Sequence, residues 1–284
     1  MVAEIIDGKK LADELIAEVG AAVKAGGLHP ALSTILVGSD PASESYIRSK
    51  MKACAKAGIV SDHHALPDST TQQELLSLVK RLDVDPSVNG ILVQLPLPKH
   101  IDENAVIAAI SPEKDVDGYT AENLGRILYG DEHLPSCTPA GIIYLLEKSG
   151  VKIEGARAVV IGRSVQVGRP LAAMLLNRGA TITICHSKTR DIAAETCRAD
   201  ILCVAVGKPG LVTGAMLKPG ATVVDVGINR VDGKLVGDVD FASAKDIAGK
   251  ITPVPGGVGP MTVAYLMKNT LKACEGQTRE AVPA

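Results

Sequence analysis

Aromatic side chains are nearly absent from this chain of 284 residues, which has no Trp, one Phe and five Tyr. Proteins that hold single-stranded nucleic acid stack the bases on aromatic side chains, so this class of ligand is excluded. Long apolar runs are absent too, since none approaches the roughly 20 residues of a membrane-spanning helix. We therefore expect neither a nucleic acid nor a membrane as a partner.

An excess of charge of one sign is also lacking, because 30 basic residues nearly balance 32 acidic ones and the net charge is -2. Such a charge does not attract nucleic acid or an anionic membrane, so any phosphate recognition must be local. The six cysteines form no C-x-x-C pair, which argues against a zinc site and a disulfide framework. With no metal and no signal-peptide pattern, we expect a cytoplasmic protein.

What the chain has in abundance is aliphatic residues, within a hydrophobic fraction of 46%. Short apolar runs that end in Gly or Pro predict strands, and apolar residues at helical spacing predict helices between them. The predicted strands are 32–37, 90–95, 156–161, 181–185, 201–206 and 222–226. The predicted helices are 9–24, 42–57, 71–82, 101–110, 140–148, 169–177 and 261–274. This alternation is typical of parallel sheets covered by helices, hence of the α/β class.

The length suits two domains rather than one. A Pro- and Ser-containing stretch at 135–139 is a candidate linker, after which Thr138 is expected to cap the next helix with Pro139 at its first position. We predict two α/β domains with an active-site cleft between them. Residues 1–139, joined by the C-terminal helix 261–284, form the catalytic domain, and residues 140–260 form a Rossmann-like dinucleotide-binding domain.

A glycine turn follows the predicted strand 156–161 and leads into a helix, a geometry that offers backbone N–H groups to a pyrophosphate. The turn begins Gly162-Arg163-Ser164 and ends at Gly168, so Ser164 stands where the G-x-G-x-x-G pattern has its middle glycine. Any α/β protein needs a glycine between strand and helix. The turn alone therefore leaves a purely structural role open.

The end of the next strand bears on which cofactor binds. A site that prefers NAD carries an acidic residue about 20 residues further on, for the ribose hydroxyl. This sequence has His186-Ser187-Lys188 there, without an acid. Arg163, Ser187 and Lys188 can accept the 2′-phosphate that a carboxylate would repel, which indicates NADP. The alternative is that Arg163 and Lys188 are solvated surface charges.

Candidate reactive residues lie in the first half of the chain. Tyr46 and Lys50 are four residues apart in a predicted helix and so share a face. A lysine desolvated beside a cleft can lose its charge and exchange a proton near neutral pH. An amphipathic helix also shows such a pair by chance. Gln94 follows an apolar strand, at the sheet edge where ligands bind.

Two further segments are candidates for binding a ligand. Asp115 and Asp117 can accept hydrogen bonds from a heterocycle with N–H donors. Calcium is the competing ligand for Asp-x-Asp-Gly, but the other ligands of an EF-hand loop are missing. The stretch Pro255-Gly-Gly-Val-Gly-Pro260 exposes backbone groups that suit the wall of an extended ligand, although it also suits a plain loop before a helix.

Seven motifs, in this order, resemble the bifunctional methylenetetrahydrofolate dehydrogenase/methenyltetrahydrofolate cyclohydrolase family. They span about Ile5 to Cys274, and one departure is Ser136, where proline is common in the family. The motifs are the Tyr46–Lys50 helix, Val93-Gln-Leu-Pro-Leu-Pro98, Lys114-Asp-Val-Asp-Gly118, Pro135-Ser-Cys-Thr-Pro139, Gly162-Arg-Ser164, His186-Ser-Lys-Thr189 and Pro253-Val-Pro-Gly-Gly-Val-Gly-Pro-Met-Thr262.

The resemblance implies an NADP-dependent oxidation of 5,10-methylenetetrahydrofolate to the methenyl form, followed by hydrolysis to 10-formyltetrahydrofolate. Both reactions belong to one-carbon metabolism and supply purine biosynthesis. It further implies that residues 1–139 bind folate and that the chain forms a homodimer through its NADP-binding domains. The absence of a long C-terminal extension suggests the stand-alone enzyme rather than one fused to a formate-activating ligase.

The resemblance also assigns roles to residues. Four of them are the catalytic candidates: Lys50 would assist hydrolysis and proton movement, Gln94 would tune it, Tyr46 would shape the folate pocket and Asp117 would hold the pterin. The folate site would be lined by Tyr46, Ile47, Arg48, Ser49, Lys50, Val93, Gln94, Leu95, Asp117, Pro255, Gly256, Gly257, Val258, Gly259, Pro260, Met261, Thr262 and Val263. NADP would be held by Gly162, Arg163, Ser164, Ser187 and Ile228.

The residues by themselves leave two other functions open. An NADP dehydrogenase for another small substrate would rest on the Rossmann half alone. A non-catalytic nucleotide-sensing module would bind the cofactor without reducing it. The second alternative leaves Tyr46, Lys50, Gln94 and Asp117 unexplained.

Overall fold

The computed structural model describes residues 2–280 and divides into two compact units. Unit 1 comprises Met1–Ala12 and Thr138–Thr262, and unit 2 comprises Asp13–Cys137 and Val263–Ala284. The chain passes between them in three helices, α1 (Gly8–Gly26), α6 (Cys137–Lys148) and α10 (Val258–Glu280).

The N-terminal segment lies in unit 1, although the sequence suggested the catalytic domain. The reason is strand pairing, because β1 (Glu4–Ile5) runs parallel to β11 (Lys250–Ile251). The two-residue strand is too short for a sequence pattern to reveal it.

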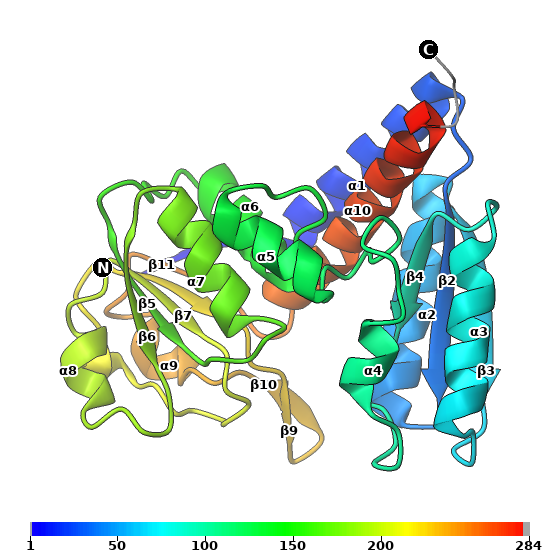
Figure 1. Cartoon of the computed structure of the whole chain (residues 1–284). Helices are drawn as coiled ribbons and strands as arrows, with labels where there is room; N and C mark the ends of the chain where they lie inside the picture. Colours follow the sequence, from blue (N-terminus) through cyan, green and yellow to red (C-terminus); the bar gives the residue numbers. More distant parts are fainter. Residues whose placement is uncertain (1, 281–284) are drawn as a thin grey trace. The chain divides into compact units, whose positions relative to one another are not determined.

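Unit 2 is built on a parallel three-stranded sheet in the order β3-β2-β4 (Figure 1). Helix α3 covers one face, where its apolar side chains Leu75, Leu78, Val79 and Leu82 form a core cluster with the strands. The elements of this unit are β2 (Ala31–Val37), α2 (Pro41–Ala57), β3 (Val60–Leu66), α3 (Gln72–Val84), β4 (Gly90–Val93), α4 (Glu103–Ile107) and α5 (Ala121–Tyr129).

Local sequence signals fix where the helices of unit 2 begin and end. Asp40 caps α2 by accepting a hydrogen bond from Ser43 N at 2.8 Å, and Gly58 ends the helix with a left-handed φ of 69°. Thr71 and Glu74 form a capping box at the start of α3. Because the three strands are parallel, their carboxyl ends lie at one edge of the sheet.

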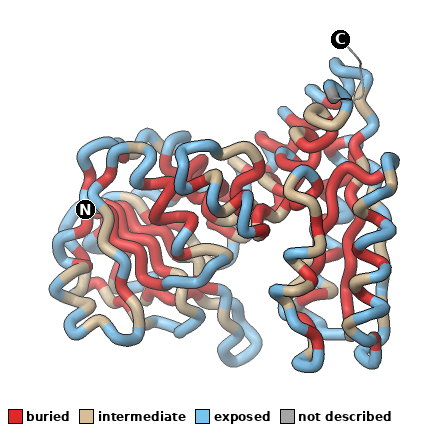
Figure 2. The backbone as a smooth tube through the Cα atoms, viewed as in Figure 1, coloured by how far each residue is buried: buried red, intermediate tan, exposed pale blue. Residues whose placement is uncertain are grey.

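Unit 1 is a Rossmann-like unit with a six-stranded parallel sheet in the order β1-β11-β8-β7-β5-β6, whose central strands are buried (Figure 2). The strand order reverses at β5, which lies between β6 and β7; ligands of open α/β sheets bind at such a switch point. The remaining elements are β5 (Arg157–Ile161), α7 (Gly168–Asn177), β6 (Thr181–Cys185), α8 (Ile192–Thr196), β7 (Ile201–Val204), a 3-10 turn (Gly214–Met216), β8 (Thr222–Asp225), β9 (Asn229–Val231), β10 (Lys234–Val236) and α9 (Phe241–Ala244).

Strands β9 and β10 form a separate antiparallel hairpin. Its turn residues Asp232 and Gly233 have φ values of 49° and 77°, the left-handed pair that Asp-Gly supplies in tight hairpins.

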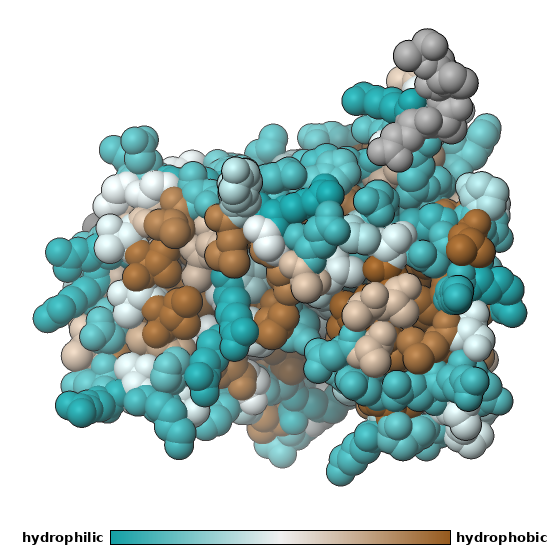
Figure 3. All heavy atoms as spheres, in the orientation of Figure 1, coloured by the Kyte–Doolittle hydropathy of each residue, from teal (hydrophilic) through white to brown (hydrophobic). Residues whose placement is uncertain are grey.

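On the face drawn in Figure 3, hydrophobic side chains are interspersed with hydrophilic ones. None of the helices within residues 2–280 is long and apolar enough to cross a membrane.

Several predicted boundaries were wrong. Helix α6 begins at Cys137, so Thr138 lies inside it and bonds Thr262 Oγ1 at 2.9 Å instead of capping it. The helix predicted at 101–110 is only the five residues of α4. The helix predicted at 261–274 begins earlier, at Val258, and continues to Glu280, and residues 281–284 of the predicted C-terminal segment lie outside the described residues.

Candidate active site

Helix α2 and strand β4 bring Lys50 and Gln94 together in unit 2. Lys50 is only 6% exposed, and its Nζ donates a hydrogen bond to Gln94 Oε1 at 3.0 Å. The Gln94 amide is oriented in turn, because its Nε2 donates to Leu95 O at 2.8 Å. The backbone N–H of Gln94 donates to Ile35 O on the neighbouring strand. The amide oxygen is therefore fixed toward the buried amine.

Asp117 is the acidic member of this cluster. Burial raises the pKa of its carboxyl group, the positive charge of Lys50 opposes that rise, and the nearby carboxylate of Asp115 adds to it. Tyr46 lies one turn before Lys50 on α2, and burial raises the pKa of its phenol. A buried amine, a carboxyl group and an amide thus lie close together in one unit.

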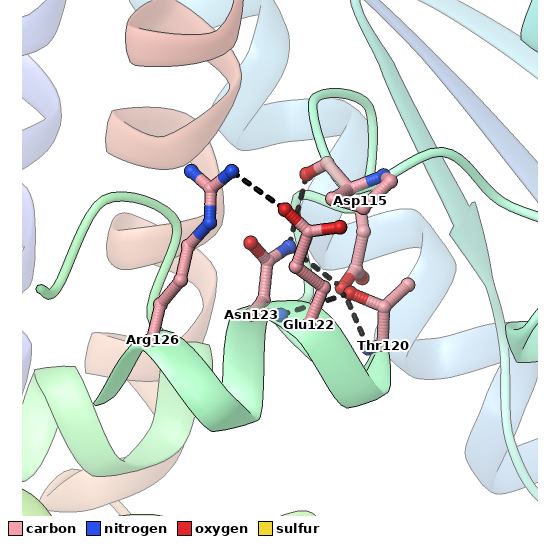
Figure 4. A network of polar contacts seen from close by, with 6 residues as sticks. Asp115, Thr120, Glu122, Asn123 and Arg126 are labelled. Carbon is pink, nitrogen blue, oxygen red and sulfur yellow. Dashed lines mark hydrogen bonds and ion pairs between the residues drawn. The ribbon is translucent and has the colours of Figure 1, made fainter. Parts of the chain in front are cut away.

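Asp115 has a structural role, which Figure 4 shows. Its Oδ1 accepts from Gly118 N at 3.0 Å, and its Oδ2 accepts from Thr120 N at 2.7 Å and Asn123 Nδ2 at 3.0 Å. These bonds tie the loop to the start of α5. Because Asp115 is committed to holding the loop, Asp117 is the acid that is left to meet a ligand.

Lys114 of the same motif is structural as well. Its Nζ donates to Asp85 O at 2.6 Å and Leu82 O at 3.3 Å, so it satisfies carbonyl groups at the end of α3. Gly118 has a φ of 71°, and a side chain there would meet the backbone of Pro135 and Ser136 at 2.5 Å. The loop therefore needs its lysine, its first acid and its glycine for shape.

Three residues around Asp117 were not predicted from the sequence. Burial raises the pKa of the Cys137 thiol well above its usual range, and Asp117 adds to the rise. Burial likewise raises the pKa of Tyr119, together with the charge of Asp117. Asn269 of α10 donates from Nδ2 to Val116 O at 2.9 Å and to Pro135 O at 2.8 Å. A buried polar residue on the apolar face of a helix was the available signal for Asn269.

Other predicted folate-site residues of unit 2 have contacts of their own within the unit. Ile47 and Val93 are buried hydrophobic side chains, and Val93 packs in the cluster under α3. Arg48 is exposed and pairs with Glu44 at 3.4 Å. Ser49 Oγ donates to the carbonyl of Ser45 at 3.1 Å. Their predicted contact with folate stays a prediction.

The glycine turn of unit 1 requires both of its glycines. Gly162 has a φ of 127°, and a Cβ there would lie 2.3 Å from Ala205 O at the end of β7. A Cβ on Gly168 would lie 2.2 Å from Gly162 O. Ser164 Oγ accepts from Val167 N at 3.2 Å and from Gly168 N at 3.3 Å. Ser164 therefore holds the start of α7, which explains a serine in place of the middle glycine.

The other predicted cofactor residues lie at the same sheet edge. Ser187 and Lys188 are exposed after β6, and Ile228, 46% exposed, follows β8. No acidic side chain directly follows β6 within the described chain. A glycine cradle at the switch point, without an acid to repel a 2′-phosphate, fits NADP.

Of the predicted segment Pro255–Val263, only Pro255–Gly257 precede α10, and Val258–Val263 form its first turns. The segment lies in unit 1 except for Val263, which belongs to unit 2. The Val254–Pro255 peptide is cis, and Gly256 has a φ of 104°. Gly256 O accepts from Lys9 N at 2.9 Å, while Val258 and Met261 are buried. That this segment lines one folate site with Lys50 stays a prediction.

Within residues 2–280, no group of three or more His, Cys, Asp and Glu side chains is placed to hold a metal ion.

Comparisons with known proteins bear on both units. Residues 6–117 match the model of the tetrahydrofolate dehydrogenase/cyclohydrolase catalytic domain, and residues 136–278 match that of its NAD(P)-binding domain. The chain is 58% identical to the Bifunctional protein FolD of Moorella thermoacetica, over 96% of this chain and 99% of that protein. The same comparison with the Bifunctional protein FolD of Bordetella avium gives 55% identity, over 97% and 98%.

Solved structures of dehydrogenase/cyclohydrolase enzymes are similar to this chain along nearly its whole length. The bifunctional enzyme FolD, methylenetetrahydrofolate dehydrogenase/cyclohydrolase, of Campylobacter jejuni has a TM-score of 0.93 and 46% identity, covering 96% of this chain and 99% of that one. The Trypanosoma brucei N5,N10-methylenetetrahydrofolate dehydrogenase-cyclohydrolase, solved with NADP cofactor and inhibitor, has a TM-score of 0.94 and 41% identity, covering 98% and 99%.

The cysteines yield a prediction. We expect a thiol-alkylating reagent at neutral pH to modify exposed Cys197 first and buried Cys137 last, because burial keeps the Cys137 thiol protonated despite the nearby Lys50 charge. Mass spectrometry of the native protein after increasing times of iodoacetamide treatment measures the order, with urea-unfolded protein as the control. Alkylation of Cys137 as fast as that of Cys197 would contradict the prediction.

Proposed function

This chain belongs to the tetrahydrofolate dehydrogenase/cyclohydrolase family. We propose that the Lys50 cluster of unit 2, formed by Tyr46, Lys50, Gln94 and Asp117, binds and converts the folate, and that the Gly162 turn of unit 1 binds the cofactor. The chain is an NADP-dependent enzyme that oxidises 5,10-methylenetetrahydrofolate to 5,10-methenyltetrahydrofolate and hydrolyses this product to 10-formyltetrahydrofolate. The single observation that carries the assignment of residues is the buried Lys50 amine held by Gln94 at 3.0 Å.

The hydrolytic step follows from the chemistry of the methenyl group. Its bridging carbon lies between two nitrogens that share a positive charge, so it is open to attack by water. The water oxygen bonds to that carbon and loses one proton to solvent. Its second proton passes to N5 as the carbon–N5 bond breaks and the formyl C=O forms. Lys50, shielded from bulk water, is the group we propose to move these protons, and Gln94 fixes the direction of its Nζ.

The role of Asp117 in folate binding is supported by its half-buried position and its place near Lys50. A desolvated carboxyl group with a raised pKa gains most from a ligand that donates N–H groups to it, as a pterin does. Tyr46, on the same helix face as Lys50, is proposed to form one side of the pocket. The same substrate would then meet all three residues.

Bound NADP would supply the hydride acceptor for the oxidation of the methylene group. The residues proposed to hold it are Gly162, Arg163, Ser164, Ser187 and Ile228. They are supported by their common position at the carboxyl edge of the unit 1 sheet and by the exposed Arg163 and Ser187, which suit a 2′-phosphate. The Pro255–Val263 segment is proposed to complete the folate site.

We expect Lys50→Met to lower the cyclohydrolase rate by roughly 100-fold or more, because the variant loses its proton-transferring amine. Methenyltetrahydrofolate absorbance measures this step, and NADPH formation measures oxidation. Lys52→Met is the matched control, because Lys52 lies two residues on in α2 and is exposed. Near wild-type hydrolysis by Lys50→Met, with the control unchanged, would remove Lys50 from the mechanism.

We expect a higher kcat/KM with NADP than with NAD. Arg163→Ala should lower the ratio of the two kcat/KM values by about tenfold, because the variant loses one charged contact to the 2′-phosphate. Initial rates with both cofactors measure the ratio. Arg157→Ala is the control, because exposed Arg157 starts β5 at the opposite end of the strand. Equal efficiency of the wild type with both cofactors would refute the preference.

A homodimer through the NADP-binding units is proposed as well. In its support, the β9–β10 ribbon buries little surface by itself, and its side chains Val231 and Leu235 are exposed. We expect light scattering to give about twice the chain mass of 29.4 kDa. Leu235→Asp should favour the monomer, and Lys234→Asp should not. A monomeric wild type would exclude the dimer.

The cellular setting proposed for these reactions is the cytoplasm, with 10-formyltetrahydrofolate supplied to purine biosynthesis. Six unpaired cysteines, five of them buried, suit a reducing compartment. Deletion of the coding sequence in its host should create a requirement for added purine or formate; growth without either would count against this role.

A further inference from the structure

Two buried carboxylates stand outside the residues assigned so far, at the carboxyl edge of the unit 1 sheet. Asp225 is the last residue of β8 and is 4% exposed, and Asp238 follows the hairpin and is fully buried. Burying a carboxylate costs free energy unless donors surround it. Both carboxylates therefore need hydrogen-bond donors around them.

Asp238 joins two loops. Its Oδ2 accepts from Val206 N at 2.7 Å and Gly207 N at 2.9 Å, and its Oδ1 accepts from Lys208 N at 2.7 Å, so three consecutive N–H groups after β7 point at one carboxylate. Oδ1 also accepts from Asn229 Nδ2 at 2.9 Å. One side chain thus ties the loop after β7 to the segment after β8.

Asp225 fixes Asp238 and the intervening turn. Its Oδ1 accepts from Gly227 N at 3.0 Å and from Asp238 N at 2.9 Å, and its Oδ2 accepts from Val239 N at 2.9 Å. Burial raises the pKa of Asp225 to about 6, although these backbone donors oppose the rise. Ile228, a proposed cofactor residue, lies between Gly227 and Asn229, which the two aspartates hold.

Glycines make room for the two carboxylates. A Cβ on Gly227 would lie 2.3 Å from Asp238 Oδ1, and a Cβ on Gly237 would lie 1.8 Å from Asp225 Oδ2. Approaches this close show that the loops are folded around the two side chains. The arrangement lies at the ends of β7 and β8, beside the point where the strand order reverses.

We propose that Asp238, itself held by Asp225, is a positioning residue that sets the affinity for NADP by fixing the Val206–Lys208 loop and the turn that carries Ile228. The inference rests on the proposed cofactor role of Ile228. This position requires a side chain that only accepts hydrogen bonds, because all four groups that bond the Asp238 carboxylate are N–H donors. An asparagine of the same shape would place an NH₂ group against one pair of these donors.

The test compares Asp238→Asn with Asp240→Asn, an equally conservative change two residues on. Asp240 accepts from Ser243 Oγ at 2.7 Å, which lies in α9 rather than in either loop. Isothermal titration with NADP in the absence of folate gives the dissociation constant. We expect a rise of about tenfold or more for Asp238→Asn and about twofold or less for Asp240→Asn.

A second readout separates positioning from general damage to the fold. Cyclohydrolase activity, assigned to unit 2, should stay within about twofold of wild type in Asp238→Asn, while KM for NADP rises and KM for folate does not. Hydrogen exchange should quicken in 206–208 and 226–229. A merely structural role would instead lower the folded fraction and both activities together.

The milder variant Asn229→Ala keeps the proposal testable if Asp238→Asn does not fold, because it removes a single donor. A rise in the dissociation constant of about threefold is expected. Unchanged NADP affinity in a folded Asp238→Asn or Asn229→Ala would overturn the inference. Failure of the wild type to bind NADP at all would instead overturn the proposed function on which it rests.

Discussion

The buried amine of Lys50 is the feature on which the chemistry of unit 2 depends. An ammonium group removed from water must find acceptors within the protein or its ligand. Gln94 supplies one through an amide whose other end is fixed on Leu95 O, and Asp117 supplies a compensating charge nearby. Gln94 directly follows β4, and the loop that carries Asp117 pairs with the same strand through the bridge between Asp115 and Ile91, so the parallel sheet is what gathers them. A change in strand register would separate the amine from its acceptor.

The loop that carries Asp117 shows how one short motif divides its work. Lys114 closes helix α3, Asp115 holds the loop to α5, and Gly118 lets the chain pass Pro135 and Ser136. Only after these three have fixed the backbone does Asp117 have a defined position. The same division holds in unit 1, where Gly162 and Gly168 shape the turn and Ser164 secures the start of α7. Motif residues are thus often needed for shape, and fewer of them meet a ligand.

Much of the fold was predictable, because buried parallel strands such as β2 and β4 are short apolar runs between turn residues. Strand β3 was not, since Val60-Ser-Asp-His-His-Ala-Leu66 is a largely polar edge strand with no such pattern. Lys50, Gln94 and Asp117 were found from their spacing and from resemblance. Cys137, Asn269, Asp225 and Asp238 were missed, because their importance comes from partners far away in the sequence. Both Asp238 and Asn269 act through backbone groups, which no residue pattern reveals.

The order of the units along the chain has a consequence for synthesis. After the short N-terminal segment of unit 1, the ribosome makes the sheet of unit 2, then the remainder of unit 1, and only afterwards the part of α10 that returns to unit 2. Asn269, which joins the Asp117 loop to the segment before α6, belongs to that last part. A nascent chain therefore carries an incomplete catalytic unit while residues 138–262 of unit 1 are being translated. During that interval its apolar surface is open to chaperones and to aggregation, and unit 1 can finish folding before the older half of the protein does.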